Sequence, residues 1–358
     1  MSSSLGAPVN VRTARADDAE VIFSLIQALA DYEKLAHEVV GSAAAIAKHS
    51  TGDTDDVQAS QRPCITTLLA EVNQTPVGLA LFFQTYSTQA AAPGYYLEDL
   101  FVLPDYRQKG VGKALLRALA QHALSHNVRQ LRWSVLDWNE LAIAFYRRIG
   151  AEISEDCRIC RVSGEALGAL GSSADSTSVS YRVVLPSEVS EVVSRLKGWG
   201  DELAEDSADD SADHAADNTA DNADGKHADR PPWTLVEALV AHGSAQVPPF
   251  ELLQVSQGDE LLGVALFTHS YSTFLTQPGV LVEAIAINPH RSHDVAEREV
   301  CRALAQLTLE RQGGRLEWYT KAHETAAIAR YQQWGATVLP NWRICRLDAG
   351  AIAKLAQA

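Results

Sequence analysis

The sequence predicts an α/β (mixed α+β) fold that is built twice in tandem, each copy with a central mixed, mostly antiparallel sheet and helices on both faces. Three observations predict it. Of the 358 residues, 46% are apolar and 21% are charged, which is typical of a globular protein. The segment that starts at Val77 matches the one that starts at Leu262 without a gap, and about a third of their positions are identical. Within each copy, apolar residues recur with strand spacing in some segments and helix spacing in others.

The repeat sets the expected domain boundaries. The gapless match runs to the shared "RICR" at Arg158 and Arg343, and Val9 pairs with Val179 upstream. A stretch rich in Gly and Ser separates the copies. We therefore expect a first domain over residues 1–170, a linker over 171–178 and a second domain over 179–358.

Extra residues in the second copy fall in an acidic tract at about 203–230. Between Asp201 and Arg230 the chain has 11 acidic and 2 basic residues, which is much of the formal net charge of −15. The tract is rich in Asp and Ala and lacks bulky apolar side chains, so we expect a disordered loop insertion.

The spacing of apolar residues predicts the helices and strands of the first copy. Asp17 or Asp18 can cap a helix whose apolar face includes Ile22, Leu25 and Leu29. Two apolar segments flank "NQT" at residues 73–75, which predicts a hairpin. The expected strands are residues 9–14, 64–72, 76–86, 95–103, 130–137 and 157–162, and two further helices are expected at 112–125 and 140–150.

The segment "RQKGVGK", residues 107–113, lies between a predicted strand and a predicted helix. A Walker loop fails because Ala114 follows Lys113 and because Arg107 stands where the first glycine is needed. A dinucleotide fingerprint fails because Leu115 occupies the third glycine position. The remaining alternatives are a helix start that merely turns the chain and a loop whose free N–H groups bind anionic oxygens.

Neighbouring segments decide between these alternatives. The loop follows a strand ending in "EDLFVLP", and together they resemble motif A of the GNAT acetyltransferases; "VLDWNELAIAFYRRIGA", residues 135–151, resembles motif B. With "ALADYEKLAHEV", these segments resemble the spermidine/spermine (diamine) and thialysine acetyltransferase branch. The resemblance covers nearly all of the first copy and the second more weakly, so it predicts tandem GNAT folds.

The resemblance implies that the first copy binds acetyl-CoA as a co-substrate, with no metal. The loop would hold the pyrophosphate, with Lys109 and Lys113 adding positive charge, and the backbone of Phe101 and Val102 would pair with the pantetheine arm. Asn139 would contact the same ligand, although a helix N-cap is an equally good use of this residue. The expected ligand-binding residues are Phe101, Val102, Arg107, Gln108, Lys109, Gly110, Val111, Gly112, Lys113 and Asn139.

Acetyl transfer to an amine needs a base for the amine and an acid for the departing thiolate. In the family, the glutamate at Glu98 is the base and the tyrosine at Tyr146 is the acid. The alternatives are a structural ion pair for Glu98 and a core position for Tyr146. Strict strand alternation predicts that Asp99 points away from Glu98. The resemblance places Asp99 near the amine. The residues expected to contact the substrate are Asp99, Tyr86 and Trp342.

The second copy has lost the loop. Ser292, Val295 and Glu297 stand opposite Arg107, Gly110 and Gly112, and Glu324 stands opposite Asn139. Glu297 would repel a pyrophosphate, so a pseudoenzyme domain is expected. Glu283 and Tyr331 survive opposite Glu98 and Tyr146. Relatives in this branch form homodimers, so we expect an intramolecular pseudo-dimer in which Tyr271, Phe274 and Trp342 wall the first site, although a core role for Trp342 is as good an interpretation.

The sequence therefore predicts an N-acetyltransferase that moves the acetyl group of acetyl-CoA to a primary amine of a small molecule, such as a polyamine or a lysine analogue. Alternatives are a protein or peptide N-acetyltransferase and a non-catalytic module that senses acetyl-CoA or an amine. No basic stripe favours nucleic acid, and no apolar segment at the start or elsewhere predicts a signal peptide or membrane span. The scattered cysteines, including Cys157 and Cys160 on opposite strand faces, favour buried thiols in a cytoplasmic setting over a zinc site.

Overall fold

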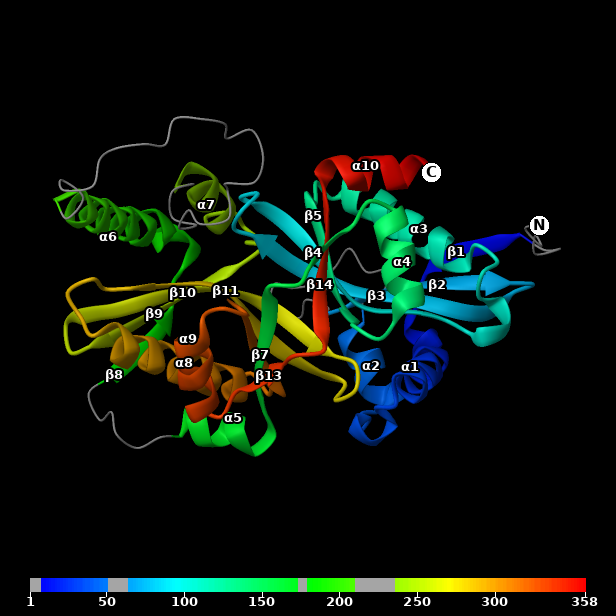
Figure 1. The fold of residues 1–358 in the computed structure, drawn as a ribbon, viewed down its shortest axis with the longest axis horizontal. Helices are drawn as coiled ribbons and strands as arrows, with labels where there is room; N and C mark the ends of the chain where they lie inside the picture. The colour runs from blue at the N-terminus through cyan, green and yellow to red at the C-terminus, as the bar shows by residue number, and fades with distance from the viewer. Residues whose placement is uncertain (1–7, 51–63, 173–178, 210–235) are drawn as a thin grey trace.

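The computed structural model describes residues 8–50, 64–172, 179–209 and 236–358. The expected linker lies largely outside the described residues, as does most of the acidic insertion, although residues 203–209 belong to a helix. Two seven-stranded sheets form the molecule, each with helices on both faces (Figure 1). The predicted mixed fold, built in tandem, is confirmed.

The first repeat contains all the elements expected from its apolar periods, together with the short helices α2 and α5 and the short strand β6. Its elements are β1 (Val9–Thr13), α1 (Ala19–Glu33), α2 (Ala43–His49), β2 (Thr66–Val72), β3 (Thr75–Ser87), β4 (Ala92–Val102), α3 (Val111–Ser125), β5 (Gln130–Leu136), α4 (Glu140–Arg148), β6 (Glu152–Ser154), β7 (Cys157–Ser163) and α5 (Gly164–Gly171).

The second repeat has the same order with a longer helix before the acidic insertion. Its elements are β8 (Val179–Val183), α6 (Val189–Asp209), α7 (Val236–Gly243), β9 (Glu251–Gln257), β10 (Glu260–Ser272), β11 (Gln277–Ile287), α8 (His293–Glu310), β12 (Arg315–Lys321), α9 (Thr325–Gln333), β13 (Thr337–Leu339), β14 (Trp342–Asp348) and α10 (Ala349–Gln357).

The two repeats exchange their last long strand and the helix that follows. The first sheet has the order β1-β2-β3-β4-β5-β14-β6, and the second has the order β13-β7-β12-β11-β10-β9-β8. Strand β14 pairs antiparallel with β5, where Cys345 lies opposite Trp133, and β7 pairs with β12, where Cys160 lies opposite Trp318. Figure 1 shows β14, in red, among the strands of the first repeat. The sequence boundary near residue 170 therefore separates two repeats, while each sheet contains a strand from both.

Each core depends on this exchange. Helix α10 packs beside α3 on one face of the first sheet, where Leu347, Ile352 and Leu355 join the first repeat's apolar side chains. On the second sheet, Leu167 and Leu170 of α5 pack with α8 in the same way. Helices α1 and α2 cover the other face of the first sheet, and α6 and α7 cover the other face of the second.

The long strands add a reciprocal contact between the repeats. Tyr86, near the end of β3, is buried in the second repeat's core, where its hydroxyl lies 3.0 Å from Nδ1 of His242. Tyr271, at the matching place in β10, is buried among the first repeat's side chains, 3.3 Å from Nδ1 of His49. The two repeats thus share core residues in both directions.

Candidate active site

A β-bulge in β4 shapes the candidate site. Leu97 lies opposite Phe82 and Asp99 lies opposite Leu81, so Glu98 is an extra residue in the pairing with β3. A bulge of this kind interrupts the alternation of side chains. Accordingly Tyr96 and Phe101, five residues apart, pack in the same apolar cluster on one face of the sheet. The expectation that Asp99 points away from Glu98 is wrong, because both residues line the same cavity.

Strands β4 and β5 separate beyond this bulge. Their parallel pairing extends only from Gly94 opposite Gln130 to Leu97 opposite Trp133, although both strands continue. The segment from Glu98 to Val102 is therefore not paired with β5. This opening between the strands forms part of the cavity, whose lining includes Phe101, Val102 and Ser134.

The start of α3 lies at one end of the same cavity. Gly110 precedes the helix with a φ of 86°, a left-handed conformation that glycine adopts without strain. Among the described residues, a Cβ atom at Gly112 would meet only the Val102 side chain, at 3.9 Å, so there is open space beside the first turn. The first N–H groups of the helix have no intrahelical partner, so they can bind an anion there.

Two polar side chains border this helix start. Arg107 donates from Nε to the Val102 carbonyl oxygen at 2.9 Å, and its guanidinium lies 4.2 Å from the Tyr32 ring centroid. Asn139 caps α4, since its Oδ1 accepts a hydrogen bond from the Ala142 N–H at 3.2 Å. The capping role weighed from the sequence is present, and Asn139 also lines the cavity.

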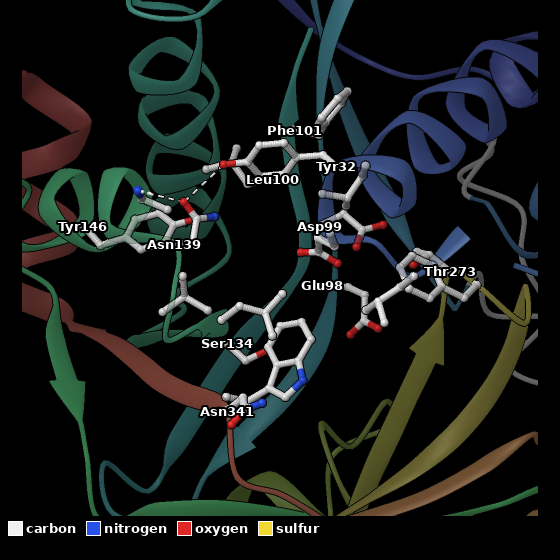
Figure 2. Close-up of a pocket in the computed structure, with 18 of the residues that line it drawn as sticks. Tyr32, Glu98, Asp99, Leu100, Phe101, Ser134, Asn139, Tyr146, Thr273 and Asn341 are labelled. Carbon is white, nitrogen blue, oxygen red and sulfur yellow. Dashed lines mark hydrogen bonds between the residues drawn. The ribbon is translucent and has the colours of Figure 1, made fainter. Parts of the chain in front are cut away.

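One continuous cavity of about 1420 Å³ joins the helix start to the bulge. Figure 2 shows Glu98 and Asp99 on one side of it and Tyr146 and Asn139 on the other. Tyr146 is buried, and its ring lies edge-on to Trp133 with 5.0 Å between ring centroids. Burial raises the pKa of Tyr146 above its ordinary value, so its hydroxyl keeps its proton at neutral pH.

Carboxylates crowd the bulged end of the cavity. Burial raises the pKa of Glu33, at the end of α1, to about 7, and the nearby Glu98 and Glu38 add to this shift. Burial also raises the pKa of Asp99 well above its ordinary value, with further contributions from Glu98 and Glu33. Asp99 Oδ2 is buried without a hydrogen-bond partner among the described residues. This group of acids favours a cationic ligand, because a nearby positive charge stabilises ionised carboxylates.

The second repeat supplies part of the cavity wall. Trp342 on the exchanged strand β14 lines it, as do Thr273 and Phe274 from the turn after β10. Of the aromatic residues expected to form this wall, Tyr271 instead belongs to the first repeat's core. Tyr86, expected at the substrate, is not among the lining residues, since it is buried in the second repeat.

Most of the expected ligand-binding residues lie along this cavity. Lys109 is exposed outside it, and the Val111 side chain is buried in the core beneath α3. The residues at the cavity are Phe101, Val102, Arg107, Gln108, Gly110, Gly112, Lys113 and Asn139.

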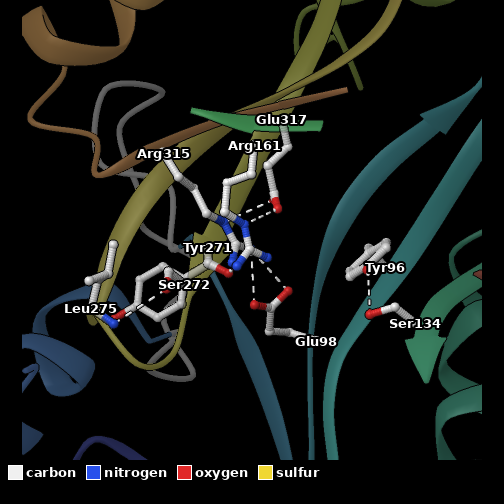
Figure 3. A network of polar contacts seen from close by, with 9 residues as sticks. All are labelled: Tyr96, Glu98, Ser134, Arg161, Tyr271, Ser272, Leu275, Arg315 and Glu317. Carbon is white, nitrogen blue, oxygen red and sulfur yellow. Dashed lines mark hydrogen bonds and ion pairs between the residues drawn. The ribbon is translucent and has the colours of Figure 1, made fainter. Parts of the chain in front are cut away.

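Sequence analysis missed a polar network next to Glu98. Arg315, at the start of β12, donates to both carboxylate oxygens of Glu98, at 2.9 and 3.0 Å (Figure 3). Glu317 pairs with Arg315 and accepts a hydrogen bond from Arg161 at 2.7 Å. The only sequence signal was in the comparison of repeats, where Arg315 and Glu317 stand opposite Gln130 and Arg132.

The matching place in the second repeat is occupied by its own side chains. Glu297 is buried in the first turns of α8 and accepts a hydrogen bond from the Tyr331 hydroxyl at 2.8 Å, and Arg330 lies 3.3 Å away. Glu283, the counterpart of Glu98, is paired with Arg132 from the first repeat. The surviving glutamate and tyrosine thus both have partners within the protein.

The site thus combines a bulged strand that separates from its parallel neighbour with a helix start opened by glycine. The model of the "Acetyltransferase (GNAT) family" matches residues 27–151. The thialysine N-epsilon-acetyltransferase of Mus musculus is 34% identical over 172 residues, which span 45% of this chain and 96% of that protein. The L-ornithine N5-acetyltransferase NATA1 of Arabidopsis thaliana is 44% identical over 93 residues, which span 26% of this chain and 41% of that protein.

Solved structures extend the likeness to the whole fold. A GCN5-related N-acetyltransferase from Sphaerobacter thermophilus superimposes with a TM-score of 0.50 at 14% identity, covering 95% of this chain and 96% of that one. The chain belongs to the GNAT family of acetyltransferases. It is an enzyme of the acyltransferase class, and acetyltransferases of this family use acetyl-CoA. Among the described residues, every helix falls short of the length or apolar character needed to cross a membrane.

Proposed function

We propose that the chain transfers the acetyl group of acetyl-CoA to a primary amine of a small molecule, at a single site in the first repeat. The observation that carries this proposal is one cavity that joins the glycine-opened start of α3 to a recess lined by Glu33, Glu98 and Asp99. An anionic co-substrate fits the first end, and an alkylammonium fits the second.

The residues at the helix start fit the pyrophosphate of acetyl-CoA. The left-handed Gly110 and the open space at Gly112 let a ligand approach the backbone closely. Gln108, also left-handed with a φ of 60°, and Lys113 border the same space. The unpaired edge of β4 at Phe101 and Val102 would accommodate the pantetheine arm.

Glu98 and Tyr146 have the chemistry for direct transfer. A primary alkylammonium has a pKa of about 10.4, so it must lose a proton before it can attack. Glu98 accepts that proton, while the amine nitrogen forms a bond to the acetyl carbon and the bond from that carbon to sulfur breaks. Tyr146 donates its phenolic proton to the departing sulfur. The nitrogen, positively charged after the attack, gives up a second proton that restores the Tyr146 hydroxyl and leaves one hydrogen on the amide. The raised pKa of Tyr146 suits this role, since the hydroxyl is still protonated when the thiolate leaves.

The substrate end favours a compact amine that carries a second polar or cationic group. Glu33 and Glu38 line the same cavity as Glu98 and Asp99, so a second cation has a partner there. The thialysine and ornithine acetyltransferases among the relatives act, by their names, on amino acids with a side-chain amine. Polyamines and lysine or ornithine analogues are therefore the proposed substrates.

We propose that the second repeat serves as a built-in partner that binds no acetyl-CoA. Glu297, buried where the pyrophosphate would lie, and its hydrogen bond from Tyr331 support this role. The exchange of β7 and β14 supports an intramolecular pseudo-dimer, in which Trp342 and Phe274 complete the amine side of the first site.

The direct test is amine-dependent release of CoA. Purified full-length chain is incubated with acetyl-CoA and one amine at a time: a diamine, a polyamine, ornithine, lysine, thialysine, a monoamine or a lysine-containing peptide. We expect thiol release with small diamines or diamino acids, and mass spectrometry should show one added acetyl group on the amine. Release with the peptide alone would favour a protein acetyltransferase. Binding of acetyl-CoA without release for any amine would favour a sensing module.

A further inference from the structure

A cation from the second repeat holds the proposed base of the first. Arg315 is nearly buried, with 5% of its side chain exposed, and its Nη2 donates to both oxygens of Glu98 and, at 2.6 Å, to the carbonyl oxygen of Tyr271. The backbone contact fixes the guanidinium on the second repeat's sheet. The orientation of the Glu98 carboxylate is therefore set by a side chain from the other repeat (Figure 3).

In each half, the glutamate at the bulge pairs with an arginine, but the two arginines lie at different positions of the repeat. In the second half, Glu283 at the bulge pairs with Arg132 of β5. Residue 317 corresponds to Arg132 in the repeat, so it would be the expected partner of Glu98. That residue is a glutamate, however, and its charge would repel Glu98. Arg315, two residues earlier on the same strand, supplies the cation instead, and Glu317 is itself paired with Arg161. The cationic partner of Glu98 thus comes from a different repeat position than the cationic partner of Glu283.

We propose that Arg315 is a positioning residue for acetyl transfer, which holds the Glu98 carboxylate in its orientation in the cavity through two hydrogen bonds. This inference rests on the proposed role of Glu98 as the base. It makes the second repeat part of the catalytic machinery through one defined contact, although that repeat has lost its own loop.

The electrostatic surroundings of Glu98 make this cation necessary. Burial is the largest influence on Glu98 and raises its pKa, while Arg315 gives the largest opposing contribution. Without Arg315, the neighbouring acids would add to the effect of burial, and Glu98 would retain its proton to a higher pH. The groups that face it are Tyr96 and Asp99 on β4, Glu33 on α1, Arg161 on β7, and Arg315 and Glu317 on β12.

The test is the pH dependence of kcat in Arg315→Met. This substitution removes the guanidinium and its hydrogen bonds and leaves Glu98, Glu317 and Arg161 in place. A base works only above its pKa, so a raised pKa moves the acid limb of the profile to higher pH. We expect a shift of about one unit or more, the usual effect of one nearby opposite charge. Arg315→Lys should shift the acid limb less than Arg315→Met does, because lysine keeps the positive charge but lacks the planar fork of the guanidinium.

A matched pair in the other half serves as the control. Arg132→Met removes the buried cation that pairs with Glu283 and should leave the acid limb where it is in the wild type. If Arg315→Met also leaves the limb unchanged while Glu98→Gln loses turnover, Arg315 is only structural and the base assignment stands. If Glu98→Gln keeps wild-type turnover, the base assignment fails and this inference fails with it.

Discussion

Replacing Gly112 by glutamate is expected to abolish acetyl-CoA binding while leaving the fold intact. The second repeat carries Glu297 at this position and still forms α8 around it. In the first repeat, the new carboxylate would lie beside the unpaired N–H groups that the pyrophosphate needs. Two like charges about 4 Å apart repel by roughly 4 kcal/mol near a protein surface, which corresponds to about a thousand-fold weaker binding.

Isothermal titration calorimetry with CoA and acetyl-CoA measures this effect, and circular dichroism checks the fold. Gly112→Gln is the matched control, since it has nearly the same size as glutamate without the charge. We expect Gln to weaken binding much less than Glu, because it lacks the charge and because the nearest described neighbour of a Cβ at this position is Val102, at 3.9 Å. Wild-type affinity in Gly112→Glu would show that the helix start does not hold the pyrophosphate.

Glu98→Gln and Tyr146→Phe should each lower kcat by on the order of 10² or more, the usual contribution of a general base or acid. Both side chains line the cavity, but neither belongs to the helix start at which we propose that the co-substrate binds. The affinity for acetyl-CoA should therefore change little, and the loss should appear in kcat. Steady-state kinetics with the best amine from the panel, together with calorimetry, separates these effects.

The repeat offers controls for both substitutions. Glu283→Gln and Tyr331→Phe change the matching residues of the second repeat, which are paired with Arg132 and Glu297. These variants should keep wild-type kcat even if their stability falls. Turnover close to wild type in Glu98→Gln and Tyr146→Phe would return both residues to structural roles.

Local patterns predicted the main elements of the first repeat well. The apolar face of α1 includes the buried Ile22, Leu25 and Leu29, as its spacing indicated. Short elements were missed: β6 has three residues and α2 has seven, too few for a period to stand out. Most of the residues that the family resemblance named line the cavity, since the glycines and the strand before them occur in one continuous segment.

What sequence reasoning missed depends on long-range pairing. Alternation in β4 fails at Glu98, because a bulge adds one residue and no local pattern marks it. The exchange of β7 and β14 was also missed, because "RICR" occurs in both repeats and either strand has a suitable pattern for either sheet. The role of Arg315 follows from this exchange and from the packing of the two sheets, so no reading of the first repeat alone could reveal it.

The central claim is that the chain has one acetyl-CoA site, in the first repeat, although it contains two GNAT repeats. The most direct measurement is the stoichiometry of acetyl-CoA binding to the full-length chain, by calorimetric titration at a protein concentration well above the dissociation constant. We predict one molecule bound per chain in the wild type, and the same value in Glu297→Gln, which removes only the charge in the second repeat's helix start. Two molecules bound per wild-type chain would contradict the account.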